Sequence, residues 1–173
     1  MWLRNPFLKL SNDENEDMQI STDRYFGNPW SEKNLRNTGF YFVRSNNKTI
    51  TLFDKWYSKK DNSPGVKEQD ALTDVIRGGI ARQLGLKVRY LDTLFFSGFC
   101  QDSRDFRAVA TVHANCCLGI NAKVGDLSAV LRDWKNFKVS YKKAEALNQT
   151  ANFPYANFRW TRHLGCQNSW RRN

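Results

Sequence analysis

The stretch Gly39-Phe40-Tyr41-Phe42-Val43 says most about the fold. A short, nearly continuous apolar run bounded by turn-forming residues is typical of a strand covered on both faces. We therefore predict a central strand here. Ile50, Phe53 and Trp56 then recur at helical spacing, which predicts an amphipathic helix that ends at a loop over residues 61–65.

The rest of the chain continues this alternation of helices and strands. Apolar residues at every fourth position predict a helix over residues 68–84, in which Gly78-Gly79 marks a kink or a close packing contact. Strands are expected at residues 86–90 and 108–112. A last helix is expected to begin at Asp126, a residue type that favours the N-cap position. This order of elements predicts an α/β fold.

Length and composition indicate a single globular domain. The chain has 173 residues, of which 40% are hydrophobic and 14% aromatic, with only 10 Gly and 4 Pro. These values exclude a disordered, collagenous or low-complexity chain. We expect one domain over residues 1–173, since no internal repeat or long linker divides it.

The net charge of +10 suggests an anionic partner, and most of it lies in the second half of the chain. Residues 1–86 carry a net charge of +2 and residues 87–173 one of +8. A nucleic acid, a phosphorylated substrate and a membrane surface are the three classes of partner that this charge allows. No stretch approaches 18 consecutive apolar residues, so the chain itself contains no membrane anchor.

The cysteines and two glycosylation sequons bear on the compartment. Cys100, Cys116, Cys117 and Cys166 allow three pairings if all are oxidised, and buried thiols or one structural disulfide are the simplest expectations. Adjacent cysteines on a strand point to opposite faces, so a metal site made by both is not expected. The sequons at residues 47–49 and 148–150 would suit a lumenal location.

Three polar clusters stand where ligands collect in α/β proteins, near strand ends and helix N-termini. They are Asn37-Thr38-Gly39, Lys67-Glu68-Gln69-Asp70 and His113-Ala114-Asn115. Each has an ordinary structural explanation, as a turn, as acidic residues in a first helical turn or as a sheet edge. Together they suit a sugar nucleotide, which needs polar groups around the sugar, a cation on the diphosphate and a basic rim.

A family resemblance joins these clusters. The sequence resembles the plant nucleotide-diphospho-sugar transferase family, related to the retaining glycosyltransferases of family 77, which include plant cell-wall arabinosyl-, xylosyl- and galactosyltransferases. The resemblance rests on the following motifs, in this order: Met1-Trp2-Leu3-Arg4-Asn5-Pro6-Phe7, Asn37-Thr38-Gly39-Phe40-Tyr41-Phe42-Val43-Arg44-Ser45-Asn46, Lys67-Glu68-Gln69-Asp70, Leu91-Asp92, Phe96-Ser97-Gly98-Phe99-Cys100, His113-Ala114-Asn115-Cys116-Cys117, Asp133-Trp134-Lys135 and Cys166.

The resemblance implies a GT-A fold, which is a Rossmann-like sheet that binds a nucleotide sugar with Mn²⁺ or Mg²⁺ in the Golgi lumen, behind an N-terminal membrane anchor. It implies a UDP-sugar donor and a glycan or glycoprotein acceptor. By this analogy Gln69 and Asp70 are the catalytic pair beside the donor sugar, and His113 is a metal ligand. Asn37, Thr38, Gly39 and Lys67 would bind the donor sugar.

The start of the chain departs from the family pattern. In the family, an Asp-x-Asp pair that binds the metal lies directly before the motif that begins here at Met1, and no Asp-x-Asp occurs in these residues. We therefore expect the C-terminal portion of a GT-A domain, without its first strands and its anchor.

Two alternatives compete with a sugar transferase. One is an inactive fragment that only binds a partner or remains as a remnant. The other is nucleic-acid binding through a basic and aromatic tail, which consists of Arg159, Trp160, Arg162, Trp170, Arg171 and Arg172. A tail that closes over a sugar-nucleotide site would have the same basic and aromatic composition. This explanation needs no nucleic acid, and we therefore expect no nucleic-acid partner.

Overall fold

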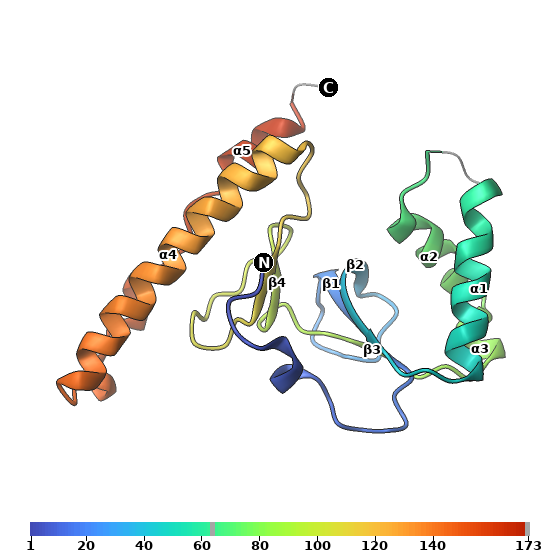
Figure 1. Cartoon of the computed structure of the whole chain (residues 1–173), viewed down its shortest axis with the longest axis horizontal. Coiled ribbons are helices and arrows are strands. Elements are labelled where there is room, and N and C mark those ends of the chain that lie inside the picture. Colours follow the sequence, from blue (N-terminus) through green and yellow to red (C-terminus); the bar gives the residue numbers. More distant parts are fainter. Residues whose placement is uncertain (63–64, 172–173) are drawn as a thin grey trace. The chain divides into compact units, whose positions relative to one another are not determined.

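A computed structural model describes residues 1–62 and 65–171 and divides the chain into two compact units (Figure 1). The central unit is Lys9–Thr93. The terminal unit combines Met1–Leu8 with the residues from Leu94 onward. The expectation of one domain over residues 1–173 stays a prediction.

The central unit contains a three-stranded sheet of order β2-β1-β3. β1 (Met18–Arg24) pairs antiparallel with β2 (Leu35–Val43) and parallel with β3 (Val88–Tyr90). The middle strand is therefore β1, and Met18 lies opposite Val43 on one side and Val88 on the other.

The prediction that residues 39–43 form the central strand was wrong, because in the described sheet β2 is an edge strand. Its apolar run serves a different purpose, which is packing against a helix. Tyr41 contacts the rings of Phe53 and Trp56, with centroids 6.0 and 6.2 Å away, while 38% of its surface stays exposed. The true middle strand, β1, has only two apolar residues, Met18 and Ile20, and polar Gln19 is as deeply buried as they are.

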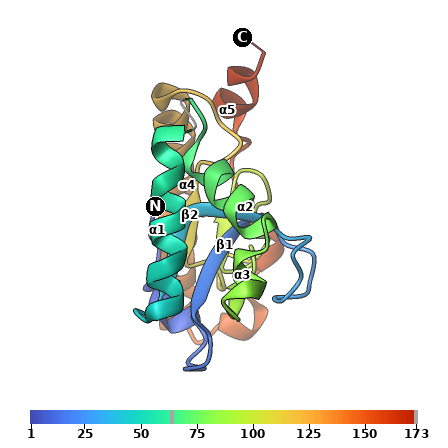
Figure 2. The ribbon, with the colours of Figure 1, turned by 90° about the vertical axis from the view of Figure 1, so that its right-hand side faces the viewer.

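Three helices cover this sheet, and α1 and α2 lie side by side (Figures 1 and 2). The expected amphipathic helix is confirmed as α1 (Asn47–Asn62), although residues 61–62 belong to the helix and residues 63–64 of the expected loop lie outside the described residues. The expected helix over residues 68–84 is divided into α2 (Glu68–Arg77) and α3 (Ile80–Gln83).

The division falls at Gly79, whose φ of 91° is a left-handed conformation that glycine adopts without steric cost. The core beneath the helices consists of Met18, Ile20, Leu52, Leu72, Val75, Ile76 and Tyr90.

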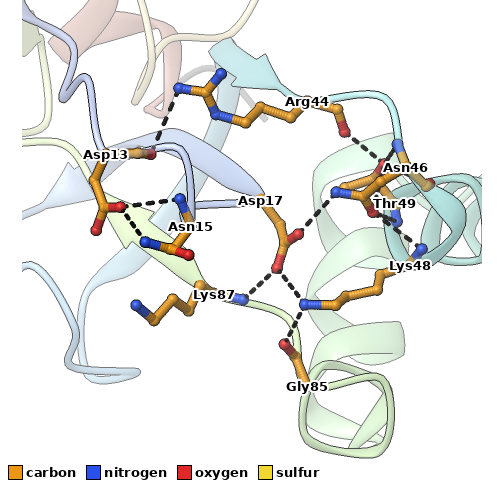
Figure 3. Close-up of polar contacts among 9 residues, drawn as sticks. All are labelled: Asp13, Asn15, Asp17, Arg44, Asn46, Lys48, Thr49, Gly85 and Lys87. Carbon is orange, nitrogen blue, oxygen red and sulfur yellow. Dashed lines mark hydrogen bonds and ion pairs between the residues drawn. The ribbon is translucent and has the colours of Figure 1, made fainter.

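Asp17 ties together three segments at the start of β1 (Figure 3). Its carboxylate accepts hydrogen bonds from the backbone N–H of Lys87 at 2.9 Å, the side-chain amide of Asn46 at 2.8 Å and the ammonium of Lys48 at 3.2 Å. Burial alone would raise the pKa of Asp17, but these three donors outweigh it and lower the pKa below its ordinary value.

The terminal unit combines a small parallel sheet with a long helix. β4 (Phe96–Gly98) pairs with β5 (Thr111–His113), and α4 (Ile120–Ala146) follows. The expected strand at residues 108–112 is thus shorter at its start and extends to His113. Short elements complete the chain: the 3-10 helices η1 (Pro6–Lys9), η2 (Thr150–Asn152) and η3 (Tyr155–Asn157), and α5 (Leu164–Ser169).

The sequence predicted that the last long helix begins at Asp126, and this prediction was wrong. α4 begins six residues earlier, at Ile120. The carboxylate of Asp126 instead accepts the backbone N–H groups of Gly165 and Cys166, at 3.3 and 2.7 Å. A residue suited to capping therefore caps the start of a different helix, α5, which only the tertiary structure brings close to it.

Aromatic rings and disulfides hold the terminal unit together. Its buried cluster consists of Phe106, Val109, Val112, Val130, Trp134, Phe137 and Phe153. Two disulfides, Cys100–Cys116 and Cys117–Cys166, use all four cysteines, where one structural bond or free thiols had been expected. Such bonds persist in oxidising compartments, and they indicate a location in the secretory pathway. No helix among the described residues is long and apolar enough to cross a membrane.

Candidate functional site

Asp23, near the end of β1, is the centre of a polar cluster in the central unit. One carboxylate oxygen accepts the side-chain amide of Asn37 at 2.7 Å, and the other accepts the side-chain amide of Gln69 at 3.0 Å. Asn37 lies on β2 and Gln69 in the first turn of α2. Two of the three sequence clusters therefore meet on this single carboxylate.

The start of α2 is attached to β2 and to α1. The backbone N–H of Thr38 donates to Oε1 of Gln69 at 3.3 Å, and the hydroxyl of Thr38 lies 3.3 Å from Oε1 of Glu68. The indole N–H of Trp56 donates to the carbonyl of Glu68 at 2.8 Å. Since both ends of the Gln69 amide have a partner, its orientation is fixed.

Asn37 is 2% exposed, and its polar atoms act within the protein. Its Oδ1 accepts the backbone N–H of Gly39 at 2.7 Å, and its carbonyl accepts the hydroxyl of Ser21 at 3.0 Å. This geometry holds the Asn37-Thr38-Gly39 segment in place. It leaves half-buried Thr38 and exposed Gly39, rather than the Asn37 side chain, to face outward.

Lys67 and Asp70 lie on the same turn of the chain but outside the hydrogen-bonded cluster. Both residues are exposed. Lys67 precedes α2 as its N-cap residue without a side-chain capping bond, and Asp70 joins Glu68 as an acidic residue of the first turn. Acidic groups at this end interact favourably with the helix dipole, so their presence has a structural explanation as well.

His113 belongs to the other unit. It ends β5 opposite Gly98 of β4, and its carbonyl accepts the backbone N–H of Phe99 at 3.1 Å. Asn115, two residues later, packs against Gly98 and accepts the N–H of Cys100 at 3.1 Å through Oδ1. The two clusters in the central unit are thus brought together by contacts within that unit, while the third cluster is organised separately within the terminal unit.

The described residues do not offer a set of ligands that fits a divalent cation. Within residues 1–62 and 65–171, no group of three or more His, Cys, Asp or Glu side chains is placed to hold a metal ion. All four cysteines are consumed by disulfides. His113 by itself does not make a cation site, since Mn²⁺ and Mg²⁺ favour several oxygen ligands. Its predicted role as a metal ligand stays a prediction.

Sequence reasoning missed Asp23, the residue that joins the cluster. Its strand was not predicted because β1 is buried on both faces, including the polar side chains of Gln19 and Ser21. The available signal was the alternation of Met18, Ile20 and Thr22 with polar residues, which is typical of a strand that ends near Asp23.

Comparison with protein families agrees with the fold. The family model described as "Nucleotide-diphospho-sugar transferase" matches residues 1–127. The chain therefore belongs to the nucleotide-diphospho-sugar transferase family. The mixed α/β structure with its small sheets is consistent with part of such a domain.

Two proteins of Arabidopsis thaliana are similar to most of the chain. "Uncharacterized protein At1g28695" is 51% identical over 170 residues, which cover 98% of this chain and 46% of that protein. "Uncharacterized protein At4g15970" is 40% identical over 149 residues, which cover 86% of this chain and 40% of that protein. The chain thus spans less than half the length of these relatives. No solved structure gives a significant match.

Proposed function

We propose that this protein transfers a sugar from a nucleotide-diphosphate sugar, a UDP-sugar, to a cell-wall polysaccharide or glycoprotein acceptor, with retention of the anomeric configuration. The observation that carries the proposal is the meeting of Asn37 and Gln69 on the carboxylate of Asp23. Three segments distant in sequence supply this cluster. Two of them carry the polar motifs predicted to bind the donor sugar, at residues 37–39 and 67–70. A GT-A fold and a Golgi location are parts of the same proposal, supported by family membership and the disulfides.

In this proposal, Gln69 faces the transferred sugar and Asp23 is a positioning residue. Sugar transfer passes through a state with positive charge at the anomeric carbon, and a group whose dipole is already oriented stabilises that charge without reorganisation. Asp23 and the N–H of Thr38 hold the Gln69 amide in one orientation. The exposed carboxylate of Asp70 would add a negative charge at the same helix end.

The Asn37-Thr38-Gly39 turn and Lys67 would contact the donor sugar and its diphosphate. Mn²⁺ or Mg²⁺ with His113 among its ligands is a proposal for the complete protein. The substrate chemistry rests instead on the positions of Asp23, Gln69 and Asp70.

The test is sugar transfer and donor hydrolysis by the complete protein, with a panel of UDP-sugars and the anomer of the product determined by NMR. Gln69→Ala should lower kcat by about 10²- to 10³-fold, the effect of removing one preorganised group. Asp23→Asn replaces one acceptor oxygen by a donor that faces the amide of Asn37 or Gln69, so it should lower kcat with little change in KM, and lower the melting temperature slightly. Asp74→Asn, on the exposed side of α2, is the matched control and should leave kcat unchanged.

The outcomes separate this function from its alternatives. Absence of turnover with every donor, while a donor or another partner still binds, would favour a non-catalytic remnant. Binding to oligonucleotides that weakens steeply with salt would favour the basic tail as a nucleic-acid site. Equal kcat losses in Gln69→Ala and Asp74→Asn would remove the assigned role of Gln69.

A further inference from the structure

The two glycosylation sequons have different surroundings in the folded chain. In the first, at residues 47–49, the hydroxyl of Thr49 donates to the carbonyl of Arg44 at 2.7 Å and accepts the N–H of Asn46 at 3.0 Å. Thr49 is only 2% exposed. Lys48, the middle residue of the sequon, is bound within the network of Figure 3. At the start of α1, the hydroxyl of Thr49 and the ammonium of Lys48 are therefore already engaged in hydrogen bonds within the protein.

The second sequon, Asn148-Gln149-Thr150, lies directly after α4. The backbone N–H groups of Asn148 and Gln149 donate to the carbonyls of Glu145 and Ala144, at 3.1 and 2.8 Å. These bonds fix the backbone of the sequon against the end of α4. Asn148 has a φ of 53°, and its side chain is exposed.

Within residues 1–62 and 65–171, the side chains of Asn148 and Thr150 make no hydrogen bond. The amide and the hydroxyl that a glycosylating enzyme must reach are therefore both unused at this place. A bulky, hydrated glycan here would extend into solvent from a helix end. At the first sequon, the hydroxyl would have to leave its buried bonds.

We propose that Asn148, rather than Asn47, carries an N-linked glycan. In the reaction, Nδ2 of Asn148 forms a bond to the anomeric carbon of an oligosaccharide carried on a lipid pyrophosphate. The bond between that carbon and the pyrophosphate oxygen breaks, one amide proton is lost to a base, and the lipid pyrophosphate leaves. Lipid-linked donors of this class are available in the secretory pathway, where the two disulfides locate the chain.

The experiment uses the complete protein purified from the secretory pathway of plant cells. Peptide-N-glycosidase A removes N-linked glycans and converts the modified Asn to Asp, and heavy-oxygen water labels each converted residue. Mass spectrometry of the peptides then gives the occupancy of each sequon. We expect label on most copies of the Asn148 peptide and little or none on the Asn47 peptide.

Variants of the hydroxyl residue keep Asn148 and its backbone conformation intact. Thr150→Ala should abolish the label on Asn148, and Thr150→Ser should retain it. Asn47→Gln, at an exposed side chain, should change the mass of the intact glycoprotein only by the added methylene group, with no loss of glycan. An unmodified Asn148 in protein whose two disulfides have formed would overturn the proposal. Occupancy of Asn47 equal to or above that of Asn148 would overturn it as well.

Discussion

The two units of this protein reach stability by different means. The central unit contains none of the four cysteines and relies on an aliphatic core together with buried polar and ionic contacts. Glu16, with a completely buried side chain, pairs with Arg89 at 2.6 Å, and Asp17 joins three segments (Figure 3). The terminal unit relies on aromatic packing and two disulfides. Oxidation state should therefore affect one unit, and loss of charge the other.

Removing the disulfide between Cys117 and Cys166 is the change with the largest expected effect. The bond joins residues 49 positions apart, and loop-closure entropy predicts that Cys117→Ser with Cys166→Ser lowers the free energy of unfolding by about 4 kcal/mol. The pair Cys100→Ser with Cys116→Ser, 16 positions apart, should cost about 3 kcal/mol. Urea unfolding measures both values, and hydrogen exchange shows which segments lose protection. Loss of protection in β1 equal to that in α4 would contradict the separation of the two units.

Arg89→Met should destabilise the central unit by about 3 kcal/mol, because it leaves the buried carboxylate of Glu16 without its cation. The guanidinium of Arg89 also lies 4.6 Å from the ring centroid of Trp30, a contact that Met retains only in part. Lys48→Met is the matched control. Lys48 is 45% exposed, and Asp17 keeps its hydrogen bonds from Lys87 and Asn46, so loss of this ion pair should cost less than about 1 kcal/mol. Equal shifts in the urea midpoints of the two variants would show that the hydrogen bonds left to Asp17 do not replace its cation.

Gly98→Ala tests the packing around His113 in the terminal unit. A methyl group on Gly98 would lie 2.5 Å from Oδ1 of Asn115, so this side chain has to move, at a cost of about 2 kcal/mol. NMR of the Cys100 amide, which donates to the same oxygen, reports the movement directly. Gly165→Ala, where the nearest atom is 3.1 Å away, should cost less. An unshifted Cys100 amide in Gly98→Ala would contradict the close approach.

The smallest expected effect is the loss of central-unit stability in acid. Hydrogen bonds lower the pKa of Asp17 below its ordinary value of 3.8, so its stabilising contribution is complete above that pH. The contribution is lost as the pH falls through the lower, folded value. Urea midpoints measured from about pH 5 downward should therefore fall less steeply for Asp17→Asn than for the natural chain. Identical slopes would mean that Asp17 does not contribute in this way.

In the candidate site, some features were predictable from the sequence and others were not. The polar motifs around Asn37 and Gln69 were identifiable because they stand at the ends of periodic segments. Their meeting point, Asp23, was not, since only Met18 and Ile20 of β1 are apolar and the polar residues Gln19, Ser21 and Thr22 are buried with them. The position of a polar residue in sequence does not tell whether its hydrogen bonds will be made internally, as those of Asn37 are.

By itself, the sequence determined the α/β class, the amphipathic helix α1, the strand around Val88 and the family motifs. Each of these depends on the spacing of neighbouring residues, which fixes which face of a helix or strand is apolar. Only the tertiary structure decided that β1 is the middle strand, that Asp126 caps α5, and that Cys116 and Cys117 join different partners. These features join residues far apart in the chain, so local spacing does not encode them.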